Sequence, residues 1–235
     1  MGKIRLVVFD MAGTTVFDRG NVADAFQQAF RANGLEVGKE KIKTVMGWRK
    51  KDAIKKLLEQ FYPEHANAIN IETIHTDFIN TMIRFYETDP ELRAQPFTEE
   101  IFAQLRQQGI KIALNTGFTR SITDTILKRL GWVEGKQVDV VIASDEVENG
   151  RPHSDMIRNI MKKLDIHDPE QVVKIGDTEV DIEEGRNAGC GIVIGVTTGA
   201  YSREQLKLYH PDHIIDSLAD LSRIIQQQEL VNSNN

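Results

Sequence analysis

The sequence has a single cysteine and no long apolar run, and both absences limit what the protein can be. With Cys190 alone, no disulfide can form within the chain, and a reducing cytoplasm is the expected location. No apolar stretch approaches the roughly 20 residues that cross a bilayer, and the first strand-like run begins too early for a signal peptide. The net charge of −6 argues against nucleic acid as the main partner. We therefore expect a cytoplasmic protein that binds neither a membrane nor nucleic acid.

Short apolar runs that alternate with helical patterns are the main structural signal in these 235 residues. Five runs have the length of buried strands, and a sixth candidate is shorter. Strands that alternate with helices indicate right-handed βαβ units, so we predict an α/β fold with a doubly wound parallel sheet. The predicted strands are Ile4–Phe9, Ile110–Asn115, Val138–Ala143, Val172–Ile175, Gly191–Val196 and His213–Ile215.

The interval between the first two predicted strands breaks this alternation. From about residue 17 to residue 94, the sequence shows only amphipathic helical patterns. A crossover between parallel strands needs a single helix, so an interval of this length implies a separate helical insertion. We predict a catalytic core of residues 1–16 and 95–235, and a helical cap of residues 17–94 beside it.

The residues after the first predicted strand carry the first chemical signal. Asp10 directly follows the apolar run. Because a carboxylate is costly to bury, we expect it at the carboxyl edge of the sheet, where open α/β sheets bind ligands. The small residues 12–15, Ala-Gly-Thr-Thr, would let backbone N–H groups approach an anion.

A second acidic signal follows the fourth predicted strand. Asp177 ends that run as Asp10 ends the first, and Asp181 comes four residues later. Three carboxylates at one crevice repel one another unless a cation neutralises them. Mg²⁺ prefers such hard oxygen ligands together with water and a phosphoryl oxygen, so we predict a magnesium site. Asp181 alone would also suit the first turn of a helix.

Two further strand ends offer groups that could bind an anion. Thr116 and Gly117 end the second strand and supply a hydroxyl and an accessible N–H. Arg151, in a Gly-Arg-Pro segment, follows the third strand, and its planar guanidinium could hold an anion and an attacking carboxylate together. Each feature alone would also fit an ordinary turn or a surface arginine.

Taken together, these segments resemble the haloacid dehalogenase-like superfamily over essentially the whole chain. The resemblance implies a Rossmann-like core, an inserted helical cap and an aspartyl-phosphate formed on Asp10. It also implies that Mg²⁺ is held by the Asp10 carboxylate and the backbone carbonyl of Ala12. Asp177 is the expected third ligand, with Asp181 helping directly or through water. The matching segments are Asp10–Thr15, Thr116-Gly117, Arg151 and Gly176-Asp177…Asp181.

Ala12 sets this chain apart from most phosphatases of the superfamily, which have a second aspartate at this position. That aspartate protonates the leaving alcohol and later activates water, and such catalysis is typically worth roughly 10²–10⁴-fold in rate. Alanine can do neither. Hydrolysis of a simple phosphate ester should therefore be slow, and the leaving group must be made tolerable in another way.

The segment Met46-Gly47-Trp48-Arg49-Lys50 suggests how. With Asp-x-Ala-Gly-Thr-Thr and Gly-Arg-Pro, it resembles the phosphonatase (phosphonoacetaldehyde hydrolase) branch of the superfamily. The resemblance implies that Lys50 forms a Schiff base with the substrate aldehyde, beside Met46. A protonated imine accepts the electrons that a broken C–P bond leaves on carbon. Met46, Gly47 and Trp48 are candidate substrate-binding residues, and Trp48 would equally suit packing between cap and core.

The sequence around Lys50 also departs from that branch. The family pattern has a histidine three residues later, where this chain has Ala53. If that histidine moves protons during imine formation, this chain must use another group or a different substrate. Residues 39–56 contain eight basic and two acidic residues. This basic run could lower the pKa of Lys50 and attract a doubly charged anion, or it could be a solvated helix face.

The leading hypothesis is a Mg²⁺-dependent hydrolase of phosphonoacetaldehyde or a related 2-oxoalkylphosphonate. The nearest alternative is a phosphomonoesterase for a small ester such as phosphoglycolate. A haloacid dehalogenase needs no cation, which Asp177 and Asp181 argue against. A receiver-type signalling module lacks a cap, and a non-catalytic binding protein would leave Asp10 and Arg151 without a role. We expect the cap to open and close over the core, and the resemblance adds a homodimer formed through the cap as an expectation.

Overall fold

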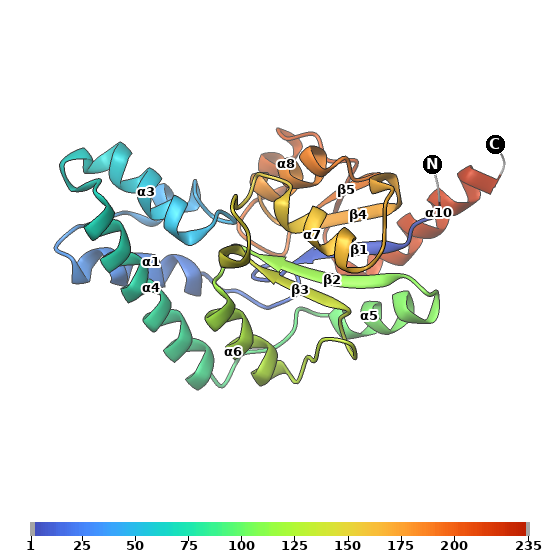
Figure 1. Ribbon diagram of the computed structural model, residues 1–235, viewed down its shortest axis with the longest axis horizontal. Helices are drawn as coiled ribbons and strands as arrows, with labels where there is room; N and C mark the ends of the chain where they lie inside the picture. The colour runs from blue at the N-terminus through green and yellow to red at the C-terminus, as the bar shows by residue number, and fades with distance from the viewer. Residues whose placement is uncertain (1–2, 234–235) are drawn as a thin grey trace.

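The computed structural model describes the backbone of residues 3–233 and the side chains of residues 3–227. Its centre is a six-stranded sheet in the order β3-β2-β1-β4-β5-β6, in which all neighbours run parallel (Figure 1). This sheet confirms the predicted α/β fold. The strands are β1 (Leu6–Asp10), β2 (Lys111–Thr116), β3 (Val140–Ala143), β4 (Val172–Gly176), β5 (Ile192–Val196) and β6 (His213–Ile215).

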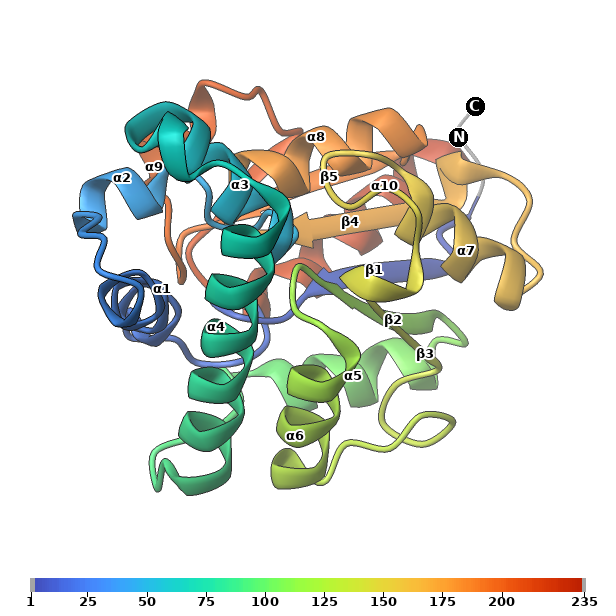
Figure 2. The ribbon, with the colours of Figure 1, turned by 60° about the vertical axis from the view of Figure 1, so that its left-hand side comes forward.

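Strand β1 lies inside the sheet, and its five side chains are all buried. Successive side chains of a strand point to opposite faces, so Val7 and Phe9 join one apolar cluster while Leu6 and Val8 join another. Figure 2 shows α5 and α6 on one side of the sheet and α7 and α8 on the other. The first layer contains α5 (Thr98–Gln107), α6 (Arg120–Leu130) and α10 (Leu221–Ser233). The second layer contains α7 (Asp155–Lys163), α8 (Glu179–Ala188) and α9 (Arg203–Lys207).

The residues between β1 and α5 form helices that lie to one side of the sheet (Figure 1). Within this part, the rings of Phe26 and Phe78 lie 4.5 Å apart in a shared apolar centre. Helix α4 also packs beside α6 of the core (Figure 2). The boundaries of the cap at residues 17 and 94 stay a prediction. Its helices are α1 (Asn21–Ala32), α2 (Lys39–Lys43), α3 (Lys50–Phe61) and α4 (Ala68–Thr88).

Two connections join these helices to the sheet, and they run side by side. Val16 forms an antiparallel bridge with Ala94. Next to it, the Phe17 N–H donates to the Arg93 carbonyl at 3.1 Å. Because these contacts hold the two connections together, any movement of the cap must bend both at once.

Two short helices and the C-terminal helix are what the sequence patterns missed. The strands differ from their predicted bounds by at most two residues at either end, whereas α2, α9 and α10 were not predicted. Helix α2 has five residues and buries one side chain, Ile42, and a single apolar residue establishes no helical period. In the described part of the chain, no helix combines the length and apolar character that a membrane crossing requires.

Candidate active site

Three aspartates meet at the carboxyl edge of the sheet. Asp10 is the last residue of β1, Asp177 directly follows β4, and Asp181 lies in the first turn of α8. One carboxylate oxygen from each lies within 4.8 Å of the others, and all three side chains are buried. The structure therefore brings together the acidic residues that the sequence singled out.

The guanidinium of Arg151 lies fully buried among acidic groups. Its Nη1 is 2.6 Å from Asp10 Oδ1 and 3.0 Å from Asp181 Oδ1, and its Nε is 3.0 Å from Glu184 Oε2. Burial alone would lower the pKa of Arg151, but Asp181, Glu184 and Asp10 outweigh burial and raise it. Arg151 is therefore positively charged throughout the physiological range, and it orients the Asp10 carboxylate.

Three buried polar residues behind this cluster were not predicted: Lys174, Glu184 and Asn115. Lys174 Nζ lies 3.0 Å from Asp181 Oδ1 and 3.3 Å from Glu184 Oε2. The Asn115 amide donates to Glu184 at 2.8 Å, and its oxygen accepts from Lys174 at 2.8 Å. A lysine in the middle of an apolar strand was the available signal, because a charge is buried only when it is paired.

The three aspartates are neutralised unequally. Burial raises the pKa of Asp181, but Arg151 and Lys174 outweigh it, so the pKa is lowered. For Asp10, burial and Asp181 raise the pKa, and Arg151 offsets this only in part. Burial, then Asp10 and Asp181, raise the pKa of Asp177 well above its usual range. The excess negative charge therefore lies at Asp10 and Asp177.

A divalent cation fits this excess charge. Carboxylate oxygens are hard donors of the kind that Mg²⁺ prefers, and those of Asp10 and Asp177 lack full compensation. At Asp181, Oδ2 accepts from Thr178 Oγ1 at 2.6 Å, and Oδ1 forms ion pairs with Arg151 and Lys174 at 3.0 Å. The geometry favours a cation between Asp10 and Asp177, with Asp181 behind them.

A small enclosed cavity of about 20 Å³ adjoins the aspartates. It unites most of the predicted site residues from core and cap. Its wall also includes Val22, Phe118 and Thr178, which the sequence analysis did not single out. The predicted residues that line it are Asp10, Ala12, Met46, Gly47, Lys50, Thr116, Gly117 and Asp177.

Trp48 is the predicted substrate-binding residue that the structure does not bring to this cavity. Its side chain lines a separate hollow beside Gly150, and Lys56 Nζ lies 4.1 Å from the centre of its ring. Only its backbone carbonyl turns toward the site, where it accepts from Lys50 Nζ at 3.1 Å. Packing between cap and core, the other role considered for Trp48, agrees with this position.

Lys50 is the one cap lysine that points into the cavity. Its side chain is almost fully buried, with Nζ 5.1 Å from the ring centre of Phe118 and 5.9 Å from that of Phe26. Burial lowers the pKa of Lys50 to about 8, although Asp10 acts to raise it. An amine with this pKa is partly unprotonated at neutral pH and can act as a nucleophile.

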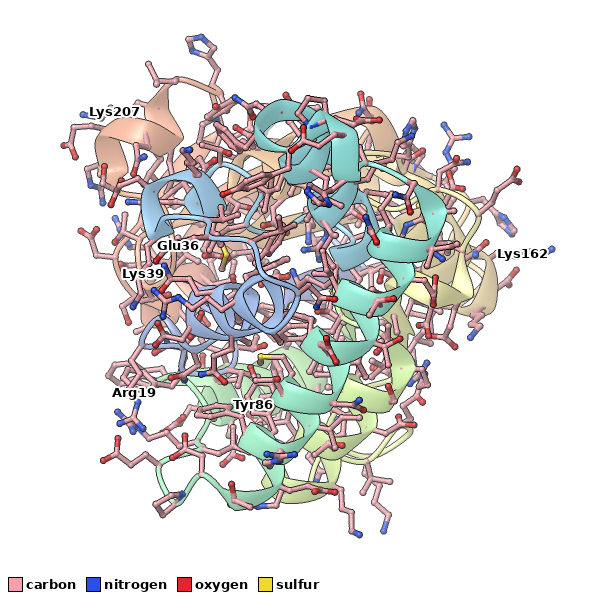
Figure 3. The ribbon with its side chains drawn as sticks, turned by 90° about the vertical axis from the view of Figure 1, so that its left-hand side faces the viewer. Arg19, Glu36, Lys39, Tyr86, Lys162 and Lys207 are labelled. Carbon is pink, nitrogen blue, oxygen red and sulfur yellow. The ribbon has the colours of Figure 1, made fainter. Side chains whose placement is uncertain are left out.

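Half of the basic residues around Lys50 are paired with acidic residues of the cap itself. Lys39, which lies beside α1 in Figure 3, pairs with Asp24 at 2.5 Å. Lys51 pairs with Glu72, and Lys55 with an acid one turn along its helix. The low pKa of Lys50 is therefore caused chiefly by burial, and the neighbouring lysines form mainly a solvated face.

Comparison with known families agrees with the resemblance seen in the sequence. The family model of haloacid dehalogenase-like hydrolases matches residues 7–195. The chain therefore belongs to the haloacid dehalogenase-like hydrolases. Its relatives make it an enzyme of the phosphatase or phosphonatase type.

Similar proteins in this family include both phosphonoacetaldehyde hydrolases and phosphatases. A phosphonoacetaldehyde hydrolase of Bacillus thuringiensis subsp. konkukian (strain 97-27) is 31% identical over 230 residues, which cover 92% of this chain and 86% of the relative. The structure of a phosphonoacetaldehyde hydrolase-like protein from Oleispira antarctica has a TM-score of 0.82 at 25% identity, covering 96% of this chain and 92% of that one. A predicted phosphoglycolate phosphatase from Haemophilus somnus 129pt shares the fold, with a TM-score of 0.78 at 21% identity and coverage of 95% and 99%.

The buried network predicts a large effect of removing Glu184. In Glu184→Ala, Arg151 and Lys174 lose a shared counter-charge, so the free energy of unfolding should fall by about 3–5 kcal/mol. Glu183→Ala, at the exposed neighbouring position in α8, should change it by less than about 0.5 kcal/mol. Urea unfolding measures both, and similar values for the two variants would contradict the network.

The raised pKa of Asp177 predicts how Asp177→Asn changes thermal stability. The pKa of Asp177 is higher in the folded than in the unfolded protein. The folded state therefore binds this proton more tightly, and the metal-free wild type loses stability as the pH rises from about 4. The asparagine variant should melt at a higher temperature than the wild type in EDTA at neutral pH, and Mg²⁺ should no longer stabilise it.

Thermal unfolding between pH 5 and 8, with EDTA or Mg²⁺, measures both effects. Asp165→Asn, at an exposed position whose carboxylate pairs with His167, should behave as the wild type does. An undiminished Mg²⁺ stabilisation in Asp177→Asn would show that the cation does not bind there.

Proposed function

We propose that this protein hydrolyses phosphonoacetaldehyde or a related 2-oxoalkylphosphonate, with Mg²⁺ and through an aspartyl-phosphate on Asp10. The observation that carries the proposal is the buried amine of Lys50, which shares one enclosed cavity with Asp10. Ala12, at the position of the usual acid, lines the same cavity. The relatives described as phosphonoacetaldehyde hydrolases support the proposal.

Lys50 would supply the electron sink. Its unprotonated amine attacks the aldehyde carbon, and uptake of one proton with loss of water leaves a protonated imine. When the C–P bond breaks, its electron pair moves onto carbon and is held as an enamine. Such a leaving group needs no proton donor, which explains how the reaction could proceed with Ala12.

Asp10 would accept the phosphoryl group. Arg151 holds Asp10 Oδ1 at 2.6 Å and leaves Oδ2 to attack phosphorus. Thr116 and Gly117 would bind the phosphoryl oxygens from the cavity wall. Water then hydrolyses the aspartyl-phosphate to inorganic phosphate. Protonation and hydrolysis of the enamine release acetaldehyde and return the amine of Lys50.

The cation site is part of the same proposal. The carboxylates of Asp10 and Asp177 and the carbonyl of Ala12 would hold Mg²⁺, with Asp181 acting through water. When bound, Mg²⁺ would neutralise the charge that gathers between these carboxylates and the phosphoryl group. Without it, the excess charge at Asp10 and Asp177 would repel a dianionic substrate.

Phosphate release distinguishes this reaction from ester hydrolysis. With Mg²⁺, the wild type should act on phosphonoacetaldehyde about 100-fold faster than on phosphoglycolate, since no acid assists the departing alkoxide. Borohydride should inactivate the enzyme only when the aldehyde is present, and Lys50→Arg should abolish this inactivation. Lys51→Arg, at the exposed neighbouring position, is the matched control. Faster release from phosphoglycolate would favour a phosphomonoesterase.

The pH dependence of this trapping reports on the same amine. Because only the unprotonated amine attacks the aldehyde, inactivation should become faster as the pH rises through about 8, the pKa of Lys50. An ordinary exposed lysine would give a midpoint near 10.4 instead. A midpoint in that higher range would show that the reacting amine is not the buried one.

A further inference from the structure

Beside the site, the cap contacts the core through residues 46–50, which we call the cap loop. The Lys50 N–H donates to the carbonyl of Gly117 at 3.3 Å. A Cβ at Gly117 would lie 2.4 Å from the Trp48 carbonyl oxygen, so only glycine allows this approach. The cap loop is therefore pressed against the loop that follows β2.

Arg49 makes the corresponding contact with the loop after β3. Its Nη1 donates to the Glu148 carbonyl at 2.9 Å. Its Nε and Nη2 donate to the two Asp52 oxygens at 2.8 and 3.2 Å. Close by, a Cβ at Gly150 would lie 2.7 Å from the Arg49 Cβ. The guanidinium is thus held by Asp52 in the cap and by the Glu148 carbonyl in the core, and the aliphatic part of the Arg49 side chain lies against Gly150.

This contact differs from those of the other basic residues nearby. Lys39, Lys51 and Lys55 pair with acidic residues of the cap itself. Arg49 instead donates one hydrogen bond across the boundary to a backbone carbonyl of the core. The hydrogen bond from Arg49 to Glu148 therefore forms only when the cap is closed on the core.

The docking contact joins the neighbours of two proposed catalytic residues. Arg49 precedes Lys50 in the cap, and Gly150 precedes Arg151 in the core. We propose that Arg49 is a positioning residue: by docking on residues 148–150, it holds Lys50 over the cavity in the same closed arrangement in which Arg151 holds Asp10. The side chain of Arg49 does not line that cavity, so it acts through its neighbours.

Hydrogen exchange without substrate tests the docking directly. In Arg49→Ala, the Lys50 amide should exchange about tenfold faster than in the wild type, the size expected for losing one charged hydrogen bond. Arg49→Lys should lie between them, because an ammonium can reach the Glu148 carbonyl but cannot hold Asp52 with a fork. Arg31→Ala, which removes an arginine paired with Glu36 inside the cap, should leave the exchange unchanged.

Gly150→Ala tests the same contact from the core side without removing a charge. Its Cβ would press on Arg49 and should also speed exchange of the Lys50 amide. Circular dichroism establishes that each variant is folded. Unchanged exchange at Lys50 in folded Arg49→Ala and Gly150→Ala would overturn the inference.

The activity measurement alone rests on the proposed function. Arg49→Ala and Gly150→Ala should each lower kcat/KM for phosphate release from phosphonoacetaldehyde by about tenfold, again the effect of one charged hydrogen bond. Arg49→Lys should recover part of this loss. Full activity in Arg49→Ala would overturn the positioning role. If the wild type does not release phosphate from this substrate, the proposed function fails, and the exchange of the Lys50 amide still decides whether Arg49 docks the cap.

Discussion

The buried guanidinium of Arg151 is the interaction on which the rest of the site depends. It contacts Asp10, Asp181 and Glu184, each at 3.0 Å or less. Charges at this depth are tolerated only when they are paired and hydrogen-bonded. The end of β1, the start of α8 and the loop after β3 must therefore come together for any of these groups to be satisfied. Folding of the sheet edge and assembly of the site are one event.

Within the described part of the chain, the charged groups of the site are not all paired, and the unpaired ones are those to which we assign chemical roles. Arg151 and Lys174 neutralise Asp181, whereas the pKa of Asp177 stays raised because its negative charge has no such partner among the described side chains. A cation bound at Asp177 would compensate this charge. Across the cavity, burial lowers the pKa of Lys50 to about 8. That burial exists only while the cap loop lies on the core, since water around an exposed amine would restore its ordinary pKa. Closure of the cap would thus place the amine and lower its pKa at the same time.

Much of the site was predictable because its signals are local. Asp10 and Asp177 each end an apolar run, and the ends of parallel strands meet at one edge of the sheet. Glu184 and Lys174 were missed because their meaning depends on each other, in a helix and a strand that pack together only in the folded chain. The two roles considered for Trp48 could not be separated, because sequence spacing does not tell which way a loop side chain turns.

The sequence by itself determined the α/β architecture, the helical insertion after the first strand and the acidic residues at the strand ends. Periodicity and turn residues act over a few neighbours, so these features can be read along the chain. Only the tertiary structure decided which charges are paired, how far each pKa moves and which cap residues reach the cavity. Burial and electrostatic interaction depend on distances in space, and residues as far apart as Arg49 and Glu148 acquire such distances only when the chain has folded.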